Sequence, residues 1–547
     1  QTVSPLADFT PSVSGSTLTL TKAGEGYEAT MTLGLDDKQI TANTVLKANQ
    51  NLQVSLFEGP VFLFGDGSNR RAHESAIFPG VDYLSTEASN NTLAIGSNVS
   101  DRWAPDPSWI TLPMMAITKA GKTLIYSWEK DQAWSPDMTT PMARFEAPSL
   151  HAGGYSVVGL FAPSGSTVME PNTSLAKKPV PLAGGATITL SAKIEMTGHA
   201  TSLEAMDYYL KNRWSLLPPH ELNKEKKTVL SALLDGYERE LVNENGWISF
   251  LGLKTEPEIL VEDVLALVGA QFLLDANAAR RSKNLINQLK LPDVKADWSY
   301  ADVLWWRTEK DNMNTYFNSL SSSATGSMDT QKPDGNWTTA LSQPNYFQRN
   351  GDMTVGKTAV PMAIIAKWAM LSGDQKAVAS ANKALDAMAK FTKPGGVSAW
   401  ELPNSNADVL STIVAMRSAS YLYKATPTQE VLDKATGLAK MALPFIYFTP
   451  VKNRPLSLYT VMPSFGATNW NRPWQGSPVE WEGTLVLDMF RWLGRETKDD
   501  FWTTIANRAQ VPAINLVSDN PANSGRFPDY IDLFPRDTQS SKTIYNI

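Results

Sequence analysis

The hydrophobic period of this 547-residue chain changes once. Up to about Met196, short segments alternate apolar and polar residues, as in 17–21, 27–33 and 186–192. Alternation with a period of two, rich in threonine and β-branched residues, predicts antiparallel strands that pack as a β-sandwich. After Leu222 the apolar residues recur at helical spacing instead. This single change of period predicts a β domain followed by an α domain.

The length of the chain agrees with two domains, because 547 residues exceed what one hydrophobic core usually supports. Between the two halves, residues 202–214 have helical spacing, and Pro218-Pro219 ends that segment. We therefore predict a β-sandwich domain over 1–198, a linker helix with a Pro-Pro junction over 199–221, and a helical domain over 222–547.

The helical half has the pattern of stacked antiparallel hairpins. Amphipathic segments of helical length occur at 224–243, 258–274, 300–320, 355–371, 375–391, 407–423, 428–443, 479–493 and 498–509. At three short turns we expect Asp374, Thr426 and Thr497 to be N-caps. Residues 426–429 have the form of a capping box, with Pro427 at the first helical position. Longer connections at 321–354, 392–406 and 448–477 alternate with these turns. All long connections should therefore emerge at one end of the stack.

Composition excludes several classes of partner. The net charge is −6, and the β half carries 13 Lys+Arg against 18 Asp+Glu, which leaves 36 against 37 in the helical half. Neither half has the basic excess of a nucleic-acid-binding protein. No run of about 18 apolar residues occurs, so we expect no membrane-spanning helix. There are no cysteines, which excludes disulfides and thiolate sites. Because the chain begins at Gln1 rather than Met, we expect a processed protein that is secreted or periplasmic.

Aromatic and charged side chains crowd into residues 469–483, at the start of a predicted helix. Two more tryptophans next to carboxylates, Trp337 and Trp400, lie in other long connections. Indole faces pack on the C–H side of a sugar ring, and carboxylates or arginines take its hydroxyls, so this mixture predicts a carbohydrate site. A tryptophan in a hydrophobic core is the alternative for each position. The residues concerned in 469–483 are Trp470, Arg472, Trp474, Glu480, Trp481 and Glu482.

A β-sandwich, a linker helix and helical hairpins with tryptophan- and carboxylate-bearing loops resemble the six-hairpin glycosidase superfamily, in the arrangement of bacterial glucoamylase-type enzymes. The resemblance covers nearly the whole chain at the level of architecture. It implies an (α/α)6 toroid as the second domain and glycoside hydrolysis with inversion, which needs two carboxyl groups about 6.5 to 9.5 Å apart. Some polysaccharide lyases share this architecture.

Glycoside hydrolysis needs one protonated and one ionised carboxyl group. Glu401 lies between Trp400 and Leu402, an apolar setting that favours a general acid. Asp334, Asp352 and Glu482 are the candidates for the base. Asp334 also fits a turn, and Asp352 also fits a helix cap.

Two further carboxylates have structural explanations of their own. Glu480 fits a capping box that starts at Ser477, with Pro478 at the first helical position, so we prefer Glu482 for chemistry. Asp408 lies at the start of the predicted helix 407–423, where it would bind a substrate hydroxyl or favour the helix dipole.

Histidine and metal chemistry contribute little to the predicted site. All four histidines precede the helical half, so only a loop of the sandwich around His73 could lend one. No metal-ligand spacing and no phosphate-binding loop occurs, and we expect neither a metal nor a cofactor.

The leading prediction is a glycoside hydrolase that cleaves a poly- or oligosaccharide. The runner-up is a polysaccharide lyase that removes the proton beside a uronate carboxylate, with Tyr346 as base or acid and Asn345 and Arg349 neutralising the carboxylate. A third possibility is a non-catalytic glycan-binding protein, which would keep the aromatic residues without convergent carboxylates.

Overall fold

A computed structural model describes most of the chain. The described residues are 8–36, 38–65, 73–87, 104–105, 107–129, 132, 142–149, 153–163, 179–248, 256–257, 259, 267, 269–271, 275–290, 310–340, 350–397, 406–451, 454–465, 478–518, 524–530 and 544–546. They form two compact units. The first comprises 1–217 with 443–452 and 464–470, and the second comprises 218–442, 453–463 and 471–547. A β unit and a helical unit are thus present, as the change of period predicts.

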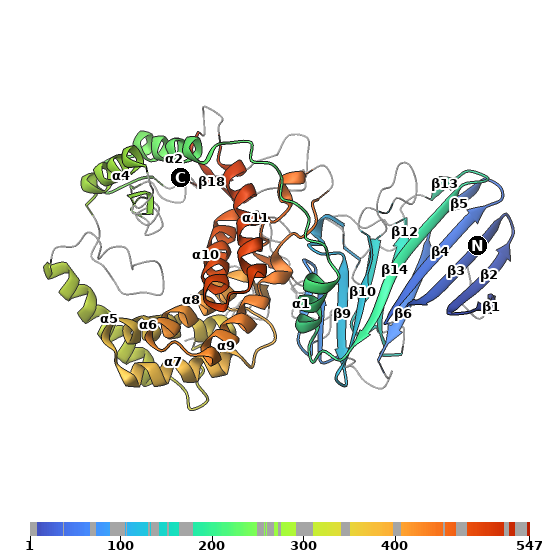
Figure 1. Ribbon diagram of the computed structural model, residues 1–547, viewed down its shortest axis with the longest axis horizontal. Helices are drawn as coiled ribbons and strands as arrows, with labels where there is room; N and C mark the ends of the chain where they lie inside the picture. The colour runs from blue at the N-terminus through green and yellow to red at the C-terminus, as the bar shows by residue number, and fades with distance from the viewer. Residues whose placement is uncertain are drawn as a thin grey trace. The chain divides into compact units, whose positions relative to one another are not determined.

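The first unit is built on a nine-stranded sheet in the order β1-β2-β3-β4-β14-β10-β9-β7-β8 (Figure 1). A three-stranded sheet, β11-β12-β6, and a pair, β13-β5, complete it. The strands are β1 (Thr10–Ser14), β2 (Thr17–Gly24), β3 (Tyr27–Asp36), β4 (Gln39–Ala48), β5 (Leu52–Val54), β6 (Phe57–Phe64), β7 (Ser75–Phe78), β8 (Asp82–Leu84), β9 (Met114–Lys119), β10 (Lys122–Ser127), β11 (Met142–Glu146), β12 (Ser156–Ala162), β13 (Val180–Leu182) and β14 (Thr187–Thr197).

Because apolar and polar residues alternate along the strands, the two types lie on opposite faces of the sheet. In the antiparallel β2-β3 pair, Leu18 lies opposite Leu33, and Thr19 lies opposite Thr32. The small sheet packs on the large one through β6, where the Tyr126 hydroxyl donates to the Pro60 carbonyl at 2.8 Å. Residues of both sheets are therefore buried between them.

Helix α1 (Ser202–Asn212) follows β14 directly, as predicted. The Thr201 side chain caps it by accepting from Glu204 N–H, and the Ser202 N–H donates to Ser75 Oγ on β7 at 2.9 Å. Arg213, just after the helix, pairs with Glu195 on β14. These contacts make α1 part of the first unit, which ends at Leu217, one residue before the predicted Pro-Pro junction.

Two later segments, 443–452 and 464–470, also belong to the first unit. The Thr111 hydroxyl donates to the Pro444 carbonyl, and Phe448 N–H donates to the Thr111 carbonyl, each at 2.8 Å. Tyr83 stacks on Phe465 with ring centroids 6.3 Å apart. The predicted helical domain, 222–547, includes both segments, because an apolar segment inside a long loop has no sequence feature that identifies its partner.

The second unit consists mainly of helices (Figure 1). They are α2 (Lys226–Glu240), α4 (Ala276–Gln288), α5 (Lys310–Thr330), α6 (Val355–Ser372), α7 (Gln375–Met388), α8 (Val409–Ala425), α9 (Gln429–Lys440), α10 (Glu480–Thr497) and α11 (Asp500–Leu516). Short elements of this unit among the described residues are η5 (Pro455–Ser457), β15 (Ala407–Asp408), β17 (Phe527–Tyr530) and β18 (Ile544–Asn546), and those of the first unit are η2 (Pro107–Trp109), η4 (Leu443–Phe445) and β16 (Ser464–Phe465). No described helix is long and apolar enough to cross a membrane.

The pairs α6-α7, α8-α9 and α10-α11 are the predicted hairpins, and one of their three predicted caps is correct. Asp374 caps α7 after Gly373, which ends α6 in the left-handed conformation at φ 73°. Helix α9 is capped by Thr428 rather than Thr426, because α8 continues to Ala425. Helix α11 is capped by Asp499 rather than Thr497, because α10 continues to Thr497 and ends at Lys498, with φ 61°.

Helix α5 also runs further than predicted, to Thr330, where we expected a loop from residue 321. The Thr325 and Thr330 hydroxyls donate to carbonyls four residues earlier, so these polar residues satisfy their groups within the helix. Helix α4, capped by Asp275, lies in a segment for which we predicted no helix. Most of the predicted helix 258–274 lies outside the described residues.

The first and last parts of the helical unit contact each other. Arg526 binds Glu240 at the end of α2 through two hydrogen bonds of 2.8 and 3.0 Å, and Asn223 N–H donates to Asn515 of α11 at 3.1 Å. This contact of the two ends is required in a ring of hairpins. The connection from α4 to α5, residues 291–309, lies outside the described residues, so the (α/α)6 toroid stays a prediction.

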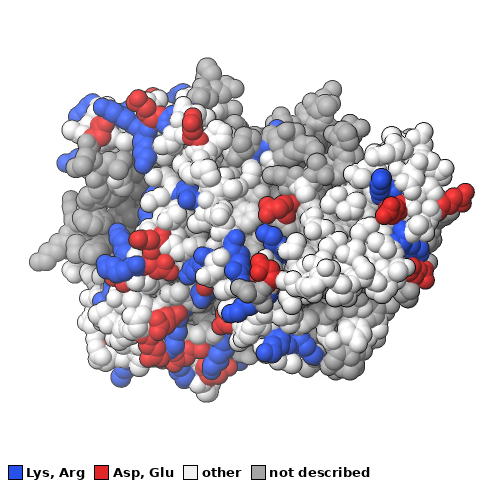
Figure 2. All heavy atoms as spheres, turned by 45° about the vertical axis from the view of Figure 1, so that its right-hand side comes forward, with Lys and Arg blue, Asp and Glu red and all other residues white. Residues whose placement is uncertain are grey.

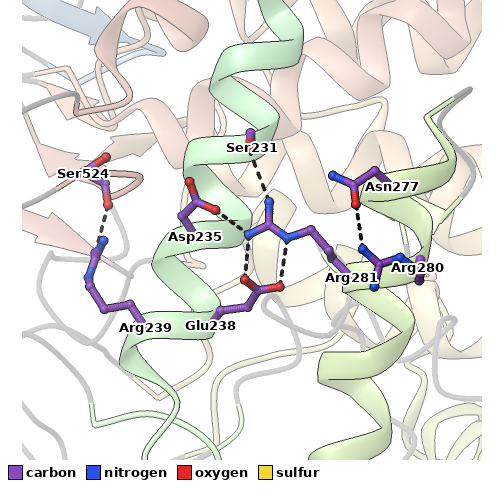
Figure 3. A network of polar contacts seen from close by, with 8 residues as sticks. All are labelled: Ser231, Asp235, Glu238, Arg239, Asn277, Arg280, Arg281 and Ser524. Atoms are coloured by element: carbon purple, nitrogen blue, oxygen red, sulfur yellow. Dashed lines mark hydrogen bonds and ion pairs between the residues drawn. The ribbon is translucent and has the colours of Figure 1, made fainter.

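Helices α2 and α4 are held together by a polar network. Figure 3 shows the guanidinium of Arg281, on α4, pointing at α2, where it binds Ser231, Asp235 and Glu238. Arg239 donates to the Ser524 carbonyl at 2.9 Å and so connects α2 to the C-terminal segment. Because Asp235 and Glu238 are largely exposed, each ion pair is worth at most about 1 kcal/mol.

Candidate functional site

The N-terminal ends of α6, α8 and α10 are joined by backbone hydrogen bonds. Gly356 N–H in α6 donates to the Gly395 carbonyl, in the segment that leads to α8. Val409 N–H in α8 donates to the Pro463 carbonyl, and Val479 N–H at the cap of α10 donates to the Val461 carbonyl, all at 2.9 Å. The connections that precede these three helices therefore meet at one end of the unit, as the hairpin pattern predicts for the described residues.

Asp408 is buried at this end and caps α8. Its Oδ1 accepts from Ser411 N–H and its Oδ2 from Gly396 N–H, both at 2.8 Å. Burial raises the pKa of this carboxyl, and the N–H donors oppose that rise. Gly396 itself has φ 97°, and a Cβ there would lie 2.1 Å from Thr354 Oγ1, the cap of α6. Asp408 therefore ties the start of α8 to the start of α6, which explains its position without a substrate.

Glu480 is buried at the first turn of α10, where its side chain is 1% exposed. The capping-box prediction for it is wrong. The N-cap is Val479, which offers no side-chain hydrogen bond, and Glu480 Oε1 instead accepts from Val461 N–H at 3.1 Å. Burial raises the pKa of this carboxyl to about 8, against the opposing effect of the Val461 N–H. Glu480 is therefore protonated at neutral pH.

Glu482 is likewise buried in the first turn of α10, and Trp481 between them is partly exposed. Both carboxyl groups thus come from the same turn of one helix. We preferred Glu482 to Glu480 as a catalytic residue because the sequence predicts a capping role for Glu480. The structure shows no such role, since the N-cap of α10 is Val479.

Asp334 lies in a turn after α5 and is exposed. Its carboxylate accepts from Asn336 N–H at 3.1 Å, and this bond holds its pKa below the ordinary value. Trp337 is 9% exposed, and its indole N–H donates to Ser327 O and Thr330 Oγ1 in α5. Turn chemistry and packing account for both residues, which were predicted for catalysis and sugar binding.

Asp352 is half-buried just before α6, whose cap is Thr354. The Asp352 charge supports the ionised form of Lys357, although burial lowers the pKa of that lysine overall. The capping alternative for Asp352 is wrong, because Thr354 Oγ1 accepts from Lys357 N–H at 3.2 Å. A partly exposed carboxylate beside a lysine therefore stands at the same end as Asp408 and Glu480.

His73 is buried in the first unit, next to the start of β7. Its Nε2 lies 3.0 Å from the Glu87 carbonyl, and burial lowers its pKa against the opposing effects of Glu87. Residues 70–72 of its loop lie outside the described part of the chain. A contribution of His73 to the site of the helical domain therefore stays a prediction.

Several predicted site residues fall outside the described residues. The described chain stops at Val397 and resumes at Asn406, and it stops again at Phe465 and resumes at Pro478. Those gaps and 341–349 contain Glu401, Trp400, Trp470, Arg472, Trp474, Asn345, Tyr346 and Arg349.

Sequence reasoning missed Tyr459 and Arg508. Tyr459 is fully buried with φ 67°, and its hydroxyl accepts from Arg508 Nη1 of α11 at 2.8 Å. Neither the left-handed backbone nor a contact across 49 residues has a signature in the sequence. Within the described residues no group of three or more acidic or histidine side chains is arranged to hold a metal ion.

Figure 2 shows both signs of charge interspersed among the described residues on one face. The described part of that face therefore has no field of a single sign, in agreement with the nearly balanced composition.

No family model and no curated protein matches this chain. Matches among solved structures include a polysaccharide lyase, 10% identical, with a TM-score of 0.35 over 96% of this chain and 86% of its own. They include an unsaturated glucuronyl hydrolase specific for heparin, 12% identical, with a TM-score of 0.38 over 54% of this chain and 83% of that one. A family 76 glycoside hydrolase from a bovine Bacteroides thetaiotaomicron strain is 8% identical, with a TM-score of 0.27 over 88% and 76%. Scores this low leave the argument about function to the residues of this chain.

Proposed function

We propose that this chain is a glycan-processing enzyme, and specifically a glycoside hydrolase, with its site at the N-terminal ends of α6, α8 and α10. The observation that carries the proposal is the convergence of these ends, each of which has a carboxyl group: Asp352 before the cap of α6, Asp408 at the cap of α8 and Glu480 in the first turn of α10. A non-catalytic glycan-binding protein would not require this convergence.

The carboxyl groups of this end differ in the way that hydrolysis requires. A general acid must hold a proton at working pH, and Glu480 does so because burial raises its pKa to about 8. A general base must be ionised, and we assign this role to Asp352, a partly exposed carboxyl group beside Lys357. Glu401 is the second candidate for the acid, and Asp334 and Glu482 are further candidates for the base.

Because Glu480 is only 1% exposed, its contact with a glycosidic oxygen requires the first turn of α10 to open when substrate binds. We propose inversion as the stereochemical course, since a separate base that activates water is part of this assignment.

The reaction class is tested with a panel of neutral and uronate-containing glycans. Reducing ends and the absorbance of unsaturated products are followed together. Hydrolysis produces reducing ends without the chromophore, which is the expected result. The chromophore would replace this proposal by elimination, and the absence of both signals across the panel would favour the glycan-binding alternative.

The acid is identified by comparing Glu480→Gln with Glu401→Gln. Loss of the proton donor should lower turnover on the natural glycan by about 10²-fold or more. The loss should shrink on nitrophenyl glycosides, whose leaving group needs little protonation. If only Glu401→Gln behaves in this way, the acid is Glu401 and the assignment of Glu480 is wrong.

A further inference from the structure

Residues 459–463, called the strap below, form a buried irregular segment. Tyr459 and Met462 are fully buried, and Val461 is 1% exposed. Connecting segments normally run over the surface, because buried backbone groups need partners. The strap finds its partners on two helices: Pro463 accepts from α8, and Val461 pairs with both Val479 and Glu480 of the α10 start.

The start of the strap is strained and is held by α11. Tyr459 has φ 67°, in the left-handed region where a bulky residue is an outlier that persists only when its surroundings enforce it. Arg508 supplies that restraint: its Nη1 donates to the Tyr459 hydroxyl at 2.8 Å, and its guanidinium lies 5.8 Å from the ring centroid. Helix α11 also packs against η5, which precedes the strap.

We propose that Arg508 and Tyr459 are positioning residues for the Glu480 carboxyl. Arg508 fixes Tyr459, which fixes Val461 two residues later, and Val461 N–H donates to Glu480 Oε1 at 3.1 Å. This inference rests on the proposed function, because the strap contributes to catalysis only if Glu480 is the general acid. Its effect on the carboxyl itself does not depend on that function.

The neighbourhood of Glu480 limits what else could move its titration. At the starts of α8 and α10 and at the strap, the described ionisable groups are Asp408, Glu482, Tyr459 and Arg508, and none of them has a resolved effect on the pKa of Glu480. The only hydrogen bond to the carboxyl among the described contacts is the one from Val461, and it lowers the pKa. If the strap shifts so that this hydrogen bond is lost while Glu480 stays buried, the pKa of Glu480 should therefore rise further.

The test uses Tyr459→Phe and Arg508→Lys in the full chain, because each removes one part of the contact while keeping the size of the side chain. Arg281→Lys is the matched control, because Arg281 also makes hydrogen bonds between two helices, α2 and α4, away from the strap (Figure 3). The protonated Glu480 carboxyl is followed by its infrared carbonyl band as pH rises, with Glu480→Gln identifying the band. The pH profile of kcat on the glycan is measured alongside.

We expect both strap variants to move the midpoint of the band upward by about 0.5 pH unit or more, and the basic limb of kcat with it, while Arg281→Lys changes neither. Unchanged midpoints in both strap variants would overturn the inference. If no glycan is cleaved, the proposed function fails, and with it the catalytic purpose of the strap. The infrared midpoint then still decides whether Arg508 and Tyr459 position the carboxyl.

Discussion

Asp408 and Glu480 lie at equivalent positions, each at the start of a helix, but they differ in the hydrogen bonds that their carboxyl groups accept. Both are buried carboxyl groups at the start of neighbouring helices, α8 and α10. Asp408 receives N–H donors from Ser411 and Gly396, whereas Glu480 receives one, from Val461. The comparison teaches that burial alone does not assign a role, since burial raises the pKa of both carboxyl groups and they differ in how many N–H donors oppose that rise.

The largest expected effect concerns the pH dependence of stability. The folded pKa of Glu480 is about 8, above the ordinary value of 4.5. Between these values the folded state binds more protons than the unfolded state, so stability is full below about 4.5 and is lost as pH rises through about 8. Glu480→Gln cannot ionise. Its stability relative to the native protein should therefore improve by about 1.4 kcal/mol for each pH unit in this window.

Urea unfolding at several pH values, followed by tryptophan fluorescence, measures this difference. Parallel stability curves for the two proteins between pH 5 and 8 would show that Glu480 titrates normally, and the contrast with Asp408 would disappear.

Removing the cap should cost more stability than removing the proton donor at neutral pH. Asp408→Ala leaves the buried N–H groups of Ser411 and Gly396 without acceptors, which should cost about 3 kcal/mol. Glu480→Gln keeps an oxygen for Val461 N–H and should change stability by less than about 1 kcal/mol below about pH 4.5, where the native carboxyl is protonated in both the folded and the unfolded state. Equal losses in the two variants would contradict the difference in roles.

The tie between α6 and α8 sharpens the same comparison. Gly396→Ala places a Cβ against Thr354 Oγ1 at a backbone angle of φ 97°, so we expect a loss of about 2 kcal/mol. Gly373→Ala is a useful reference, because that residue also has positive φ, at 73°, but no atom within 4 Å of the added Cβ. In thermal unfolding, Gly396→Ala should have a lower midpoint temperature than Gly373→Ala. The reverse order would be incompatible with tight packing at the N-terminal ends of α6 and α8.

The smallest expected loss of stability is that of a helix cap that is not deeply buried. Thr428 Oγ1 accepts from Val431 N–H at 3.3 Å, so Thr428→Ala should cost about 1 kcal/mol. Thr426→Ala is the matched control, because Thr426 ends α8 and does not cap α9. If the control loses as much stability as Thr428→Ala, the cap we first predicted from the sequence would be the correct one.

Much of the fold was predictable because it follows from local periodicity. The strands at 17–21, 27–33 and 186–192 and the hairpin around Gly373 are confirmed, since alternation and turn chemistry act over a few residues. Boundaries were less predictable: α5 and α10 extend beyond their expected ends because polar residues satisfied their hydrogen bonds inside the helix or because a non-glycine residue took the left-handed C-cap.

The candidate site divides in the same way. By itself, the sequence determined that carboxylates and aromatic residues gather in the long connections between hairpins, because residue types and spacing are local properties. Only the tertiary structure decided that Asp408 is a cap and that burial raises the pKa of Glu480. It alone also decided that Arg508 binds Tyr459, in the strap that contacts Glu480. Burial, and the donors that reach a carboxyl from distant segments such as Val461, set its pKa, and neither is encoded in neighbouring residues.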